Sequence, residues 1–170
     1  ANTNMAAVGG VIAAMITTSV LYKGKIDATM VFNGAIGGLV SITAEPLMPT
    51  MGQSVLIGGV GGILVVLSVP LLDKLKIDDV VGAVSVHLVA GIWGTLAVPL
   101  SNGDATFGAQ IMGIVGVGVF MIVTSSILWL ALKATIGIRV SEEDEDIGLD
   151  RAELGMEAYP EFGRGSQTLN

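Results

Sequence analysis

The sequence predicts an all-α polytopic membrane protein with five transmembrane helices. Apolar residues make up 52% of the chain, charged residues 14%, and glycine 24 of the 170 positions. A water-soluble domain of this size seldom has such a composition. A helix that spans a bilayer needs roughly 20 mainly apolar residues, and stretches close to this length recur along the chain. A transmembrane β-barrel is not expected, because the apolar runs lack polar residues at every second position.

The expected spans are separated by short polar or proline-bearing breaks. They cover residues 5–22, 28–43, 52–72, 80–100 and 108–132. The second is short, and Gly58, Gly59, Gly61 and Gly62 crowd the third. Small residues let helix backbones approach closely inside a membrane. This glycine run has no following lysine, so we interpret it as a packing surface and not as a phosphate-binding loop.

The basic residues predict the orientation of the chain. They are Lys23, Lys25, Lys74, Lys76, Lys133, Arg139, Arg151 and Arg164. All eight are expected on one side of the membrane, which the positive-inside rule identifies as the cytoplasm. Residue 1 is then expected outside. The chain begins with neither a methionine nor a basic leader, so we expect it to start within a longer protein.

The net charge of −7 belongs mainly to the end of the chain, since nine of the fifteen acidic residues follow Ser141. We therefore divide the chain into a transmembrane domain, residues 1–139, and a cytoplasmic tail, residues 140–170. Ser141 precedes several acids and is expected to cap a short helix. Beyond Tyr159 we expect a frayed end.

His87 is the single histidine and lies within the fourth expected span. Seven residues from the start of that span put it about 10 Å into the membrane. An ionisable side chain at this depth suggests a functional site. The alternative is a structural histidine that bonds a neighbouring helix. At 100° per residue, its helix face is expected to carry Ala83, Ala90, Gly91 and Gly94, with Leu88 pointing elsewhere.

Other polar residues carry weaker signals. Asn33 either lines a polar path or, more commonly for such a residue, bridges two helices. Asp78 and Asp79 are expected to cap the fourth helix. His87 has no second ligand nearby, and the chain has no cysteine, so we expect neither a metal nor a cofactor.

Several blocks of the sequence form a recognisable set, at residues 1–7, 33–44, 77–87, 91–96, 137–143, 148–150 and 157–159. Together these blocks resemble ammonium transporters of the Amt/Mep/Rh family. They follow the order found in the family and extend over nearly the whole chain. The resemblance is therefore highly specific.

The resemblance implies that the chain is the C-terminal half of an eleven-helix protomer, helices seven to eleven plus the tail, which assembles as a homotrimer in the inner cell membrane. The implied function is transport of ammonium or ammonia through a narrow apolar pore, with histidine-assisted proton handling and no enzyme activity. His87 matches the second of two pore histidines. Ile36 and Ala83 match pore-lining positions, and we add Asn33 as a candidate.

The tail resembles a segment that couples neighbouring pores and contacts PII-type signalling proteins. The candidate regulatory residues are Arg139, Glu142, Glu143, Gly148, Asp150 and Tyr159. Leu154 and Ala152 depart from the family, because relatives carry a histidine and, in plants, a phosphorylatable threonine there.

Two other functions remain open: an ammonium sensor that signals through the tail, and a structural helical subunit of a membrane complex. A sensor is expected to continue into a kinase or cyclase domain. A structural subunit would not need His87.

Overall fold

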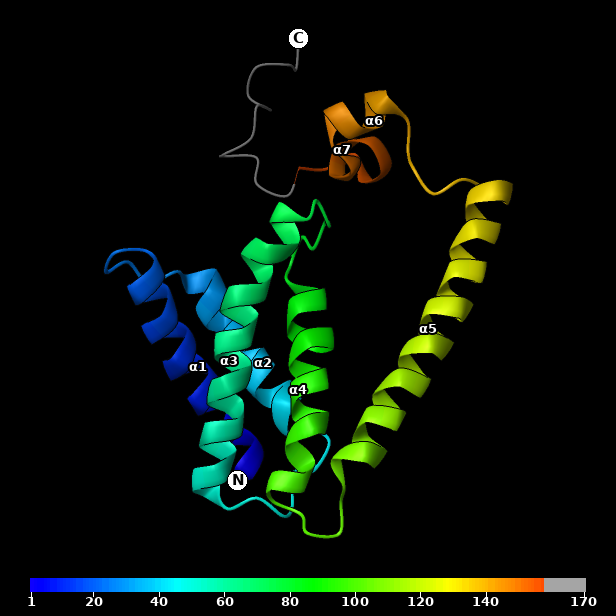
Figure 1. Cartoon of the computed structure of the whole chain (residues 1–170). Coiled ribbons are helices and arrows are strands. Elements are labelled where there is room, and N and C mark those ends of the chain that lie inside the picture. The colour runs from blue at the N-terminus through cyan, green and yellow to red at the C-terminus, as the bar shows by residue number, and fades with distance from the viewer. Residues whose placement is uncertain (158–170) are drawn as a thin grey trace. The chain divides into compact units, whose positions relative to one another are not determined.

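The computed structural model describes residues 1–157, and every regular element in that range is a helix (Figure 1). The chain forms two compact units, residues 1–119 and residues 120 onward. Helix α5 (Phe107–Thr135) begins in the first unit and ends in the second. The all-helical fold predicted from the sequence is confirmed.

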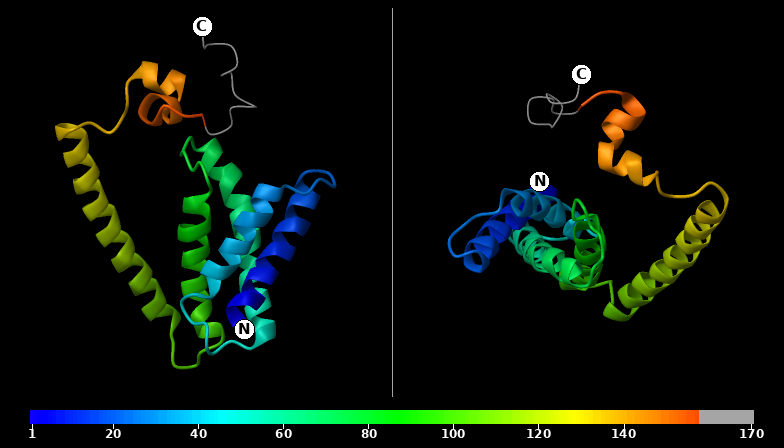
Figure 2. Two further views of the ribbon diagram at one scale, coloured as in Figure 1. Left: turned by 180° about the vertical axis from the view of Figure 1, so that it is seen from behind. Right: turned by 90° about the horizontal axis from the view of Figure 1, so that it is seen from above.

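The first unit is built around four helical segments. They are α1 (Asn2–Leu21), α2 (Ala28–Ile42), α3 (Met51–Lys74), and a fourth that comprises the π-helix η1 (Val84–Val89), α4 (Ala90–Ala97) and the 3₁₀ turn η2 (Val98–Leu100). α1 and α3 run in one direction, and α2 and α4 run in the other (Figures 1 and 2). The second unit contains the end of α5 with α6 (Glu142–Ile147) and α7 (Leu149–Leu154).

These helices match the five expected spans. α1, α3 and α5 are long and apolar enough to cross a membrane, whereas α2 and the segment Val84–Leu100 are shorter apolar helices. Three boundaries differ from the expected ones by three residues: α1 begins at Asn2, the fourth span begins at Ala83 and α5 ends at Thr135. Residues 80–82 form a turn before the helix starts.

Glycines allow the backbones of α1, α2 and α3 to touch. A Cβ atom at Gly58 would lie 2.0 Å from the carbonyl oxygen of Ala6, and one at Gly10 would lie 2.1 Å from that of Gly34. Both distances are far shorter than any real contact, so only glycine fits at these crossings. The interpretation of the glycine run in α3 as a packing surface is therefore confirmed.

Buried hydroxyl groups bond to the backbone of their own helices. Thr18 donates to the carbonyl oxygen of Ala14 at 2.8 Å, and Ser41 donates to that of Gly37 at 2.7 Å. In residues 1–157 every buried side-chain nitrogen or oxygen has a hydrogen-bond partner. This is what a membrane interior requires, since lipid offers no partner to a polar group.

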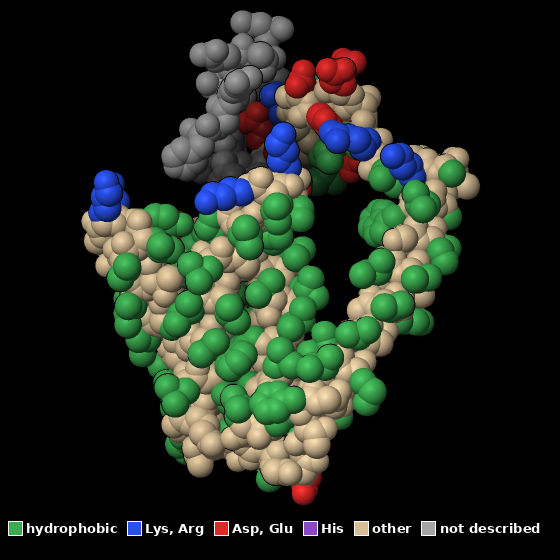
Figure 3. Space-filling view, in the orientation of Figure 1, with side chains coloured by type: hydrophobic (Ala, Val, Ile, Leu, Met, Phe, Trp, Pro, Cys, Tyr) green, Lys and Arg blue, Asp and Glu red, His purple; other side chains and the backbone are tan. Residues whose placement is uncertain are grey.

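The lysines of the first unit gather at one end. Lys23 and Lys25 follow α1, and Lys74 and Lys76 close α3, which runs parallel to α1 (Figures 1 and 3). The connectors at the opposite end, residues 43–50 and 101–106, contain no basic residue. For this unit the predicted segregation of basic residues is confirmed.

Candidate functional site

His87 is exposed on the π-helix η1, and this changes the helix face that it occupies. Ala90 is fully buried and Gly94 is buried, whereas Leu88 is 56% exposed. The face expected from 100° per residue was therefore wrong for Ala90 and Gly94, whereas Ala83 is exposed as His87 is. In a π-helix the N–H of residue i+5 donates to the carbonyl oxygen of residue i, and this widens the turn. Residues after the π-helix therefore no longer align with His87 at 100° per residue. Such segments occur often at functional sites.

Asp79 holds the start of this helix. Its carboxylate accepts hydrogen bonds from the backbone N–H groups of Val84 at 3.0 Å and Ser85 at 3.1 Å, and from the Ser85 hydroxyl at 3.2 Å. The expectation that Asp79 is a cap is confirmed, whereas Asp78 is an exposed residue of the preceding turn. Burial raises the pKa of the Asp79 carboxyl, but the hydrogen bonds outweigh burial and leave this pKa below its ordinary value.

Asn33 lies against the turn that precedes η1. Gly82 has a φ of +77°, and a Cβ atom there would lie 2.7 Å from Nδ2 of Asn33. Further along, a Cβ at Gly91 would lie 3.7 Å from Cγ1 of Val40. His87 lies between these two places where α2 meets the fourth segment.

The other candidate pore residues are also on the surface of the first unit. Ile36 on α2 is 42% exposed, and Ala83 and His87 are exposed on the fourth segment. Asn33 is half-buried. Whether these residues line a pore stays a prediction.

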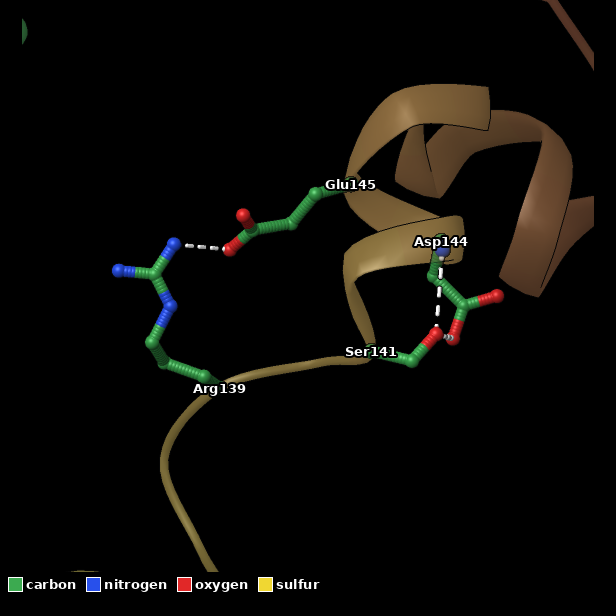
Figure 4. A network of polar contacts seen from close by, with 4 residues as sticks. All are labelled: Arg139, Ser141, Asp144 and Glu145. Carbon is green, nitrogen blue, oxygen red and sulfur yellow. Dashed lines mark hydrogen bonds and ion pairs between the residues drawn. The ribbon is translucent and has the colours of Figure 1, made fainter.

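In the second unit, polar contacts tie the connector after α5 to α6 (Figure 4). The guanidinium of Arg139 pairs with the carboxylate of Glu145. The Ser141 hydroxyl accepts a hydrogen bond from the backbone N–H of Asp144 at 3.1 Å and donates to the Asp144 carboxylate at 2.7 Å. The predicted cap is thus confirmed. Glu142 and Glu143 are exposed in the first turn of α6.

A sharp turn at Gly148 separates α6 from α7. Gly148 has a φ of +94°, which favours glycine. Asp150 lies close to this turn, since a Cβ at Gly148 would lie 2.9 Å from its carboxylate. Arg151 pairs with Glu157 at 3.2 Å. The last candidate residue of the tail, Tyr159, lies outside the described residues.

Sequence reasoning missed three residues that fix the fourth segment. Ser85 bonds Asp79, Gly82 makes the turn, and the indole N–H of Trp93 donates to the carbonyl oxygen of Ile57 at 2.9 Å. The glycine three residues after Asp79 was a usable turn signal. Neither the Ser85 bond nor the Trp93 bond has a comparable signal in the sequence.

Comparison with known proteins gives a consistent result. The model of the Ammonium Transporter Family matches residues 1–159. Ammonium transporter Amt1 of Haloferax mediterranei is 39% identical over 158 residues, which cover 90% of this chain and 30% of that protein. Ammonium transporter Amt2 of Archaeoglobus fulgidus is 39% identical over 181 residues, covering 95% of this chain and 38% of that protein.

Solved structures agree. A structure titled "Sensor Amt Protein" superposes with a TM-score of 0.83 at 34% identity and covers 89% of this chain and 40% of that one. The crystal structure of Candida albicans Mep2 superposes with a TM-score of 0.77 at 28% identity and covers 99% and 42%, respectively. The chain thus spans about a third to two-fifths of the length of these relatives.

Proposed function

This chain belongs to the ammonium transporter family, and we propose that it forms the C-terminal part of a membrane protein that transports ammonium or ammonia through a narrow apolar pore. The observation that carries the proposal is the exposed imidazole of His87 within an apolar helical segment, where Ala83 and, on the apolar helix α2, Ile36 are also exposed. Helices from the remainder of the protein would cover this surface and complete the pore.

The chemistry of the surface suits a neutral solute better than a cation. A bare cation is costly to transfer into an apolar pore, whereas ammonia is small, neutral and able to form hydrogen bonds. A neutral imidazole accepts a hydrogen bond at one nitrogen and donates at the other, so His87 would hold ammonia or pass on its proton. Potassium has no proton to give up and would be rejected at this step.

The assembly follows the same proposal. Residues 1–139 would form the membrane part of one protomer in a homotrimer in the inner cell membrane, and residues 140–170 a cytoplasmic tail. The four lysines at one end of α1 and α3 support a cytoplasmic location for that end. The acidic helix α6, tied to the preceding connector by Arg139, would offer a surface for a PII-type regulator.

Methylammonium uptake by the full-length protein tests the role of His87. We expect His87→Ala to lower the uptake rate by about tenfold, because the variant removes the hydrogen-bonding group that would hold ammonia in the pore. His87→Asp would place a carboxylate in the pore, and we expect it to change the proton-coupled current relative to uptake. Leu88→Ala is the matched control, since Leu88 is the adjacent exposed residue. Unchanged uptake and current in both His87 variants would refute the proposal.

A second candidate function is ammonium sensing. Its specific support is the similarity to the structure titled "Sensor Amt Protein". The two functions differ in what happens at saturating substrate: a transporter accumulates methylammonium, and a sensor binds it without flux. Binding measured in detergent together with uptake in proteoliposomes separates them. Binding without uptake would favour the sensor.

A further inference from the structure

The connectors that follow α1 and α3 share one sequence pattern, Lys-x-Lys-Ile-Asp, at residues 23–27 and 74–78. Both helices also end with the same hydrogen bond, from residue i to residue i−5. The N–H of Gly24 donates to the carbonyl oxygen of Ser19 at 2.7 Å, and that of Ile77 donates to Leu72 at 3.0 Å. Because α1 and α3 run in the same direction, the two connectors lie at the same end of the first unit (Figure 1).

Each connector holds a lysine in the left-handed backbone region. Lys23 has a φ of +54° and Lys76 a φ of +59°, and they are the two non-glycine residues of the described chain with positive φ. Glycine usually ends a helix at this position, because an L side chain there strains the backbone. Residues with a strained backbone are often found where the side chain has a function.

The first connector also forms a cleft. Tyr22, Lys25, Ile26 and Asp27 line an open depression of about 310 Å³. The Asp27 carboxylate is engaged as the cap of α2, where it accepts the N–H of Met30 at 3.0 Å. The ion pairs of residues 1–157 both involve arginines, so the ammonium group of Lys25 has no carboxylate partner in that part of the chain.

Apolar side chains continue from this cleft onto α1. Val20 is 75% exposed and Ile26 is 53% exposed, while Tyr22 stands between them at the end of the apolar helix. A tyrosine with apolar residues on one side and lysines on the other is typical of the boundary between hydrocarbon and headgroups. A ligand at this point would need both a negative group and an apolar part.

We propose that the α1–α2 connector binds the headgroup of an anionic phospholipid. The ammonium groups of Lys23 and Lys25 and the Tyr22 hydroxyl would contact its phosphate, and its acyl chains would lie along Val20. The α3–α4 connector is a weaker site, because Asp73 directly precedes its first lysine, where the α1–α2 connector has Tyr22. The proposal requires a membrane-embedded chain and is independent of ammonium conduction.

The test compares spin-labelled phosphatidylglycerol with spin-labelled phosphatidylcholine at the surface of the full-length protein in phosphatidylcholine vesicles. A lysine near a membrane surface strengthens attraction to anionic lipid by about fivefold. We therefore expect Lys25→Gln to lower the preference for phosphatidylglycerol by about fivefold. An unchanged preference would overturn the proposal.

Two glycine variants distinguish lipid binding from backbone strain. Lys23→Gly should raise the thermal midpoint in neutral detergent, because strain is relieved, and yet lower the lipid preference. Lys76→Gly is the control, which should raise the midpoint and leave the preference unchanged. An equal loss of preference in both variants would refute assignment to the first connector. Displacement of the labelled lipid by millimolar inorganic phosphate would indicate a soluble-anion site and would also overturn the proposal.

Discussion

The carboxylate of Asp79 accepts two hydrogen bonds from Ser85, one from its backbone N–H at 3.1 Å and one from its hydroxyl at 3.2 Å. Ser85 is six positions after Asp79, which is farther along the chain than an ordinary helix cap reaches. The turn at residues 80–82 makes this reach possible and brings Asp79 back to the first turn of η1. The orientation of His87, two residues after Ser85, therefore depends on a carboxylate outside the helix.

Removing this carboxylate should destabilise the fourth segment. We expect Asp79→Ala to lower the free energy of unfolding by about 1–2 kcal/mol, the usual effect of losing a helix cap. Ser85→Ala removes one of the three bonds and should cost less. Unfolding in mixed detergent micelles measures the stability of both variants. Equal stability of Asp79→Ala and the wild type would contradict the capping role.

The same carboxylate predicts a dependence on pH. Its pKa in the folded protein lies below the ordinary value of 3.8. A depressed folded pKa means that the ionised group stabilises the fold fully above about pH 4, and that this contribution falls as the pH drops through the folded value. The difference in stability between the wild type and Asp79→Asn should therefore be constant from pH 5 to 7 and shrink below pH 4. A difference that grows on acidification would contradict this sign.

Gly82 should tolerate no side chain. Alanine at a φ of +77° is strained, and its Cβ would lie 2.7 Å from Nδ2 of Asn33. We expect Gly82→Ala to cost about 1–3 kcal/mol of stability. Gly91→Ala is a suitable control, since a Cβ there meets Val40 at an ordinary 3.7 Å and alanine favours a helix. In thermal unfolding, Gly82→Ala should lower the midpoint, whereas Gly91→Ala should raise it or lower it much less.

The sequence predicted the helices much better than it predicted the helix face around His87. Apolar length and the breaks between runs located all five spans, because a bilayer imposes these lengths directly. The π-helix was not predicted, since no period in the residues distinguishes Val84–Val89 from an ordinary α-helix. The positions assigned to Ala90 and Gly94 on the face of His87 were wrong, whereas the functional role of His87, inferred from its isolation in an apolar run, stays a prediction.

Polar residues in the tail also predicted one local structure. Ser141 before five acids predicted a capped helix, and α6 is capped by Ser141. The turn into α7 was not predicted, because Gly148 interrupts an acidic stretch that shows no apolar period. The pairing of Arg139 with Glu145 depends on the path of the connector, which composition does not encode.

The glycines of α3 offer a prediction with a neighbouring control. Gly58→Ala would push a methyl group to 2.0 Å from the carbonyl oxygen of Ala6 and should force α1 and α3 apart, at a cost of about 1–3 kcal/mol or more. Gly59→Ala should be tolerated, because the nearest atom to its Cβ is the Gly9 carbonyl oxygen at 3.7 Å. Resistance to unfolding in detergent measures both variants. Similar stability of the two would contradict the close crossing of α1 and α3.

The last prediction separates a helix cap from an ion pair in the second unit. Arg139 and Glu145 are exposed, with 75% and 44% of their side-chain surfaces accessible, so their pairing should contribute well under about 1 kcal/mol and weaken with salt. Ser141 satisfies a backbone N–H of a helix only six residues long, and short helices depend strongly on their caps. Amide hydrogen exchange in α6 should therefore accelerate more in Ser141→Ala than in Arg139→Gln. In high salt the Arg139→Gln variant should match the wild type, whereas Ser141→Ala should still exchange faster, and the reverse ranking would show that the ion pair holds α6.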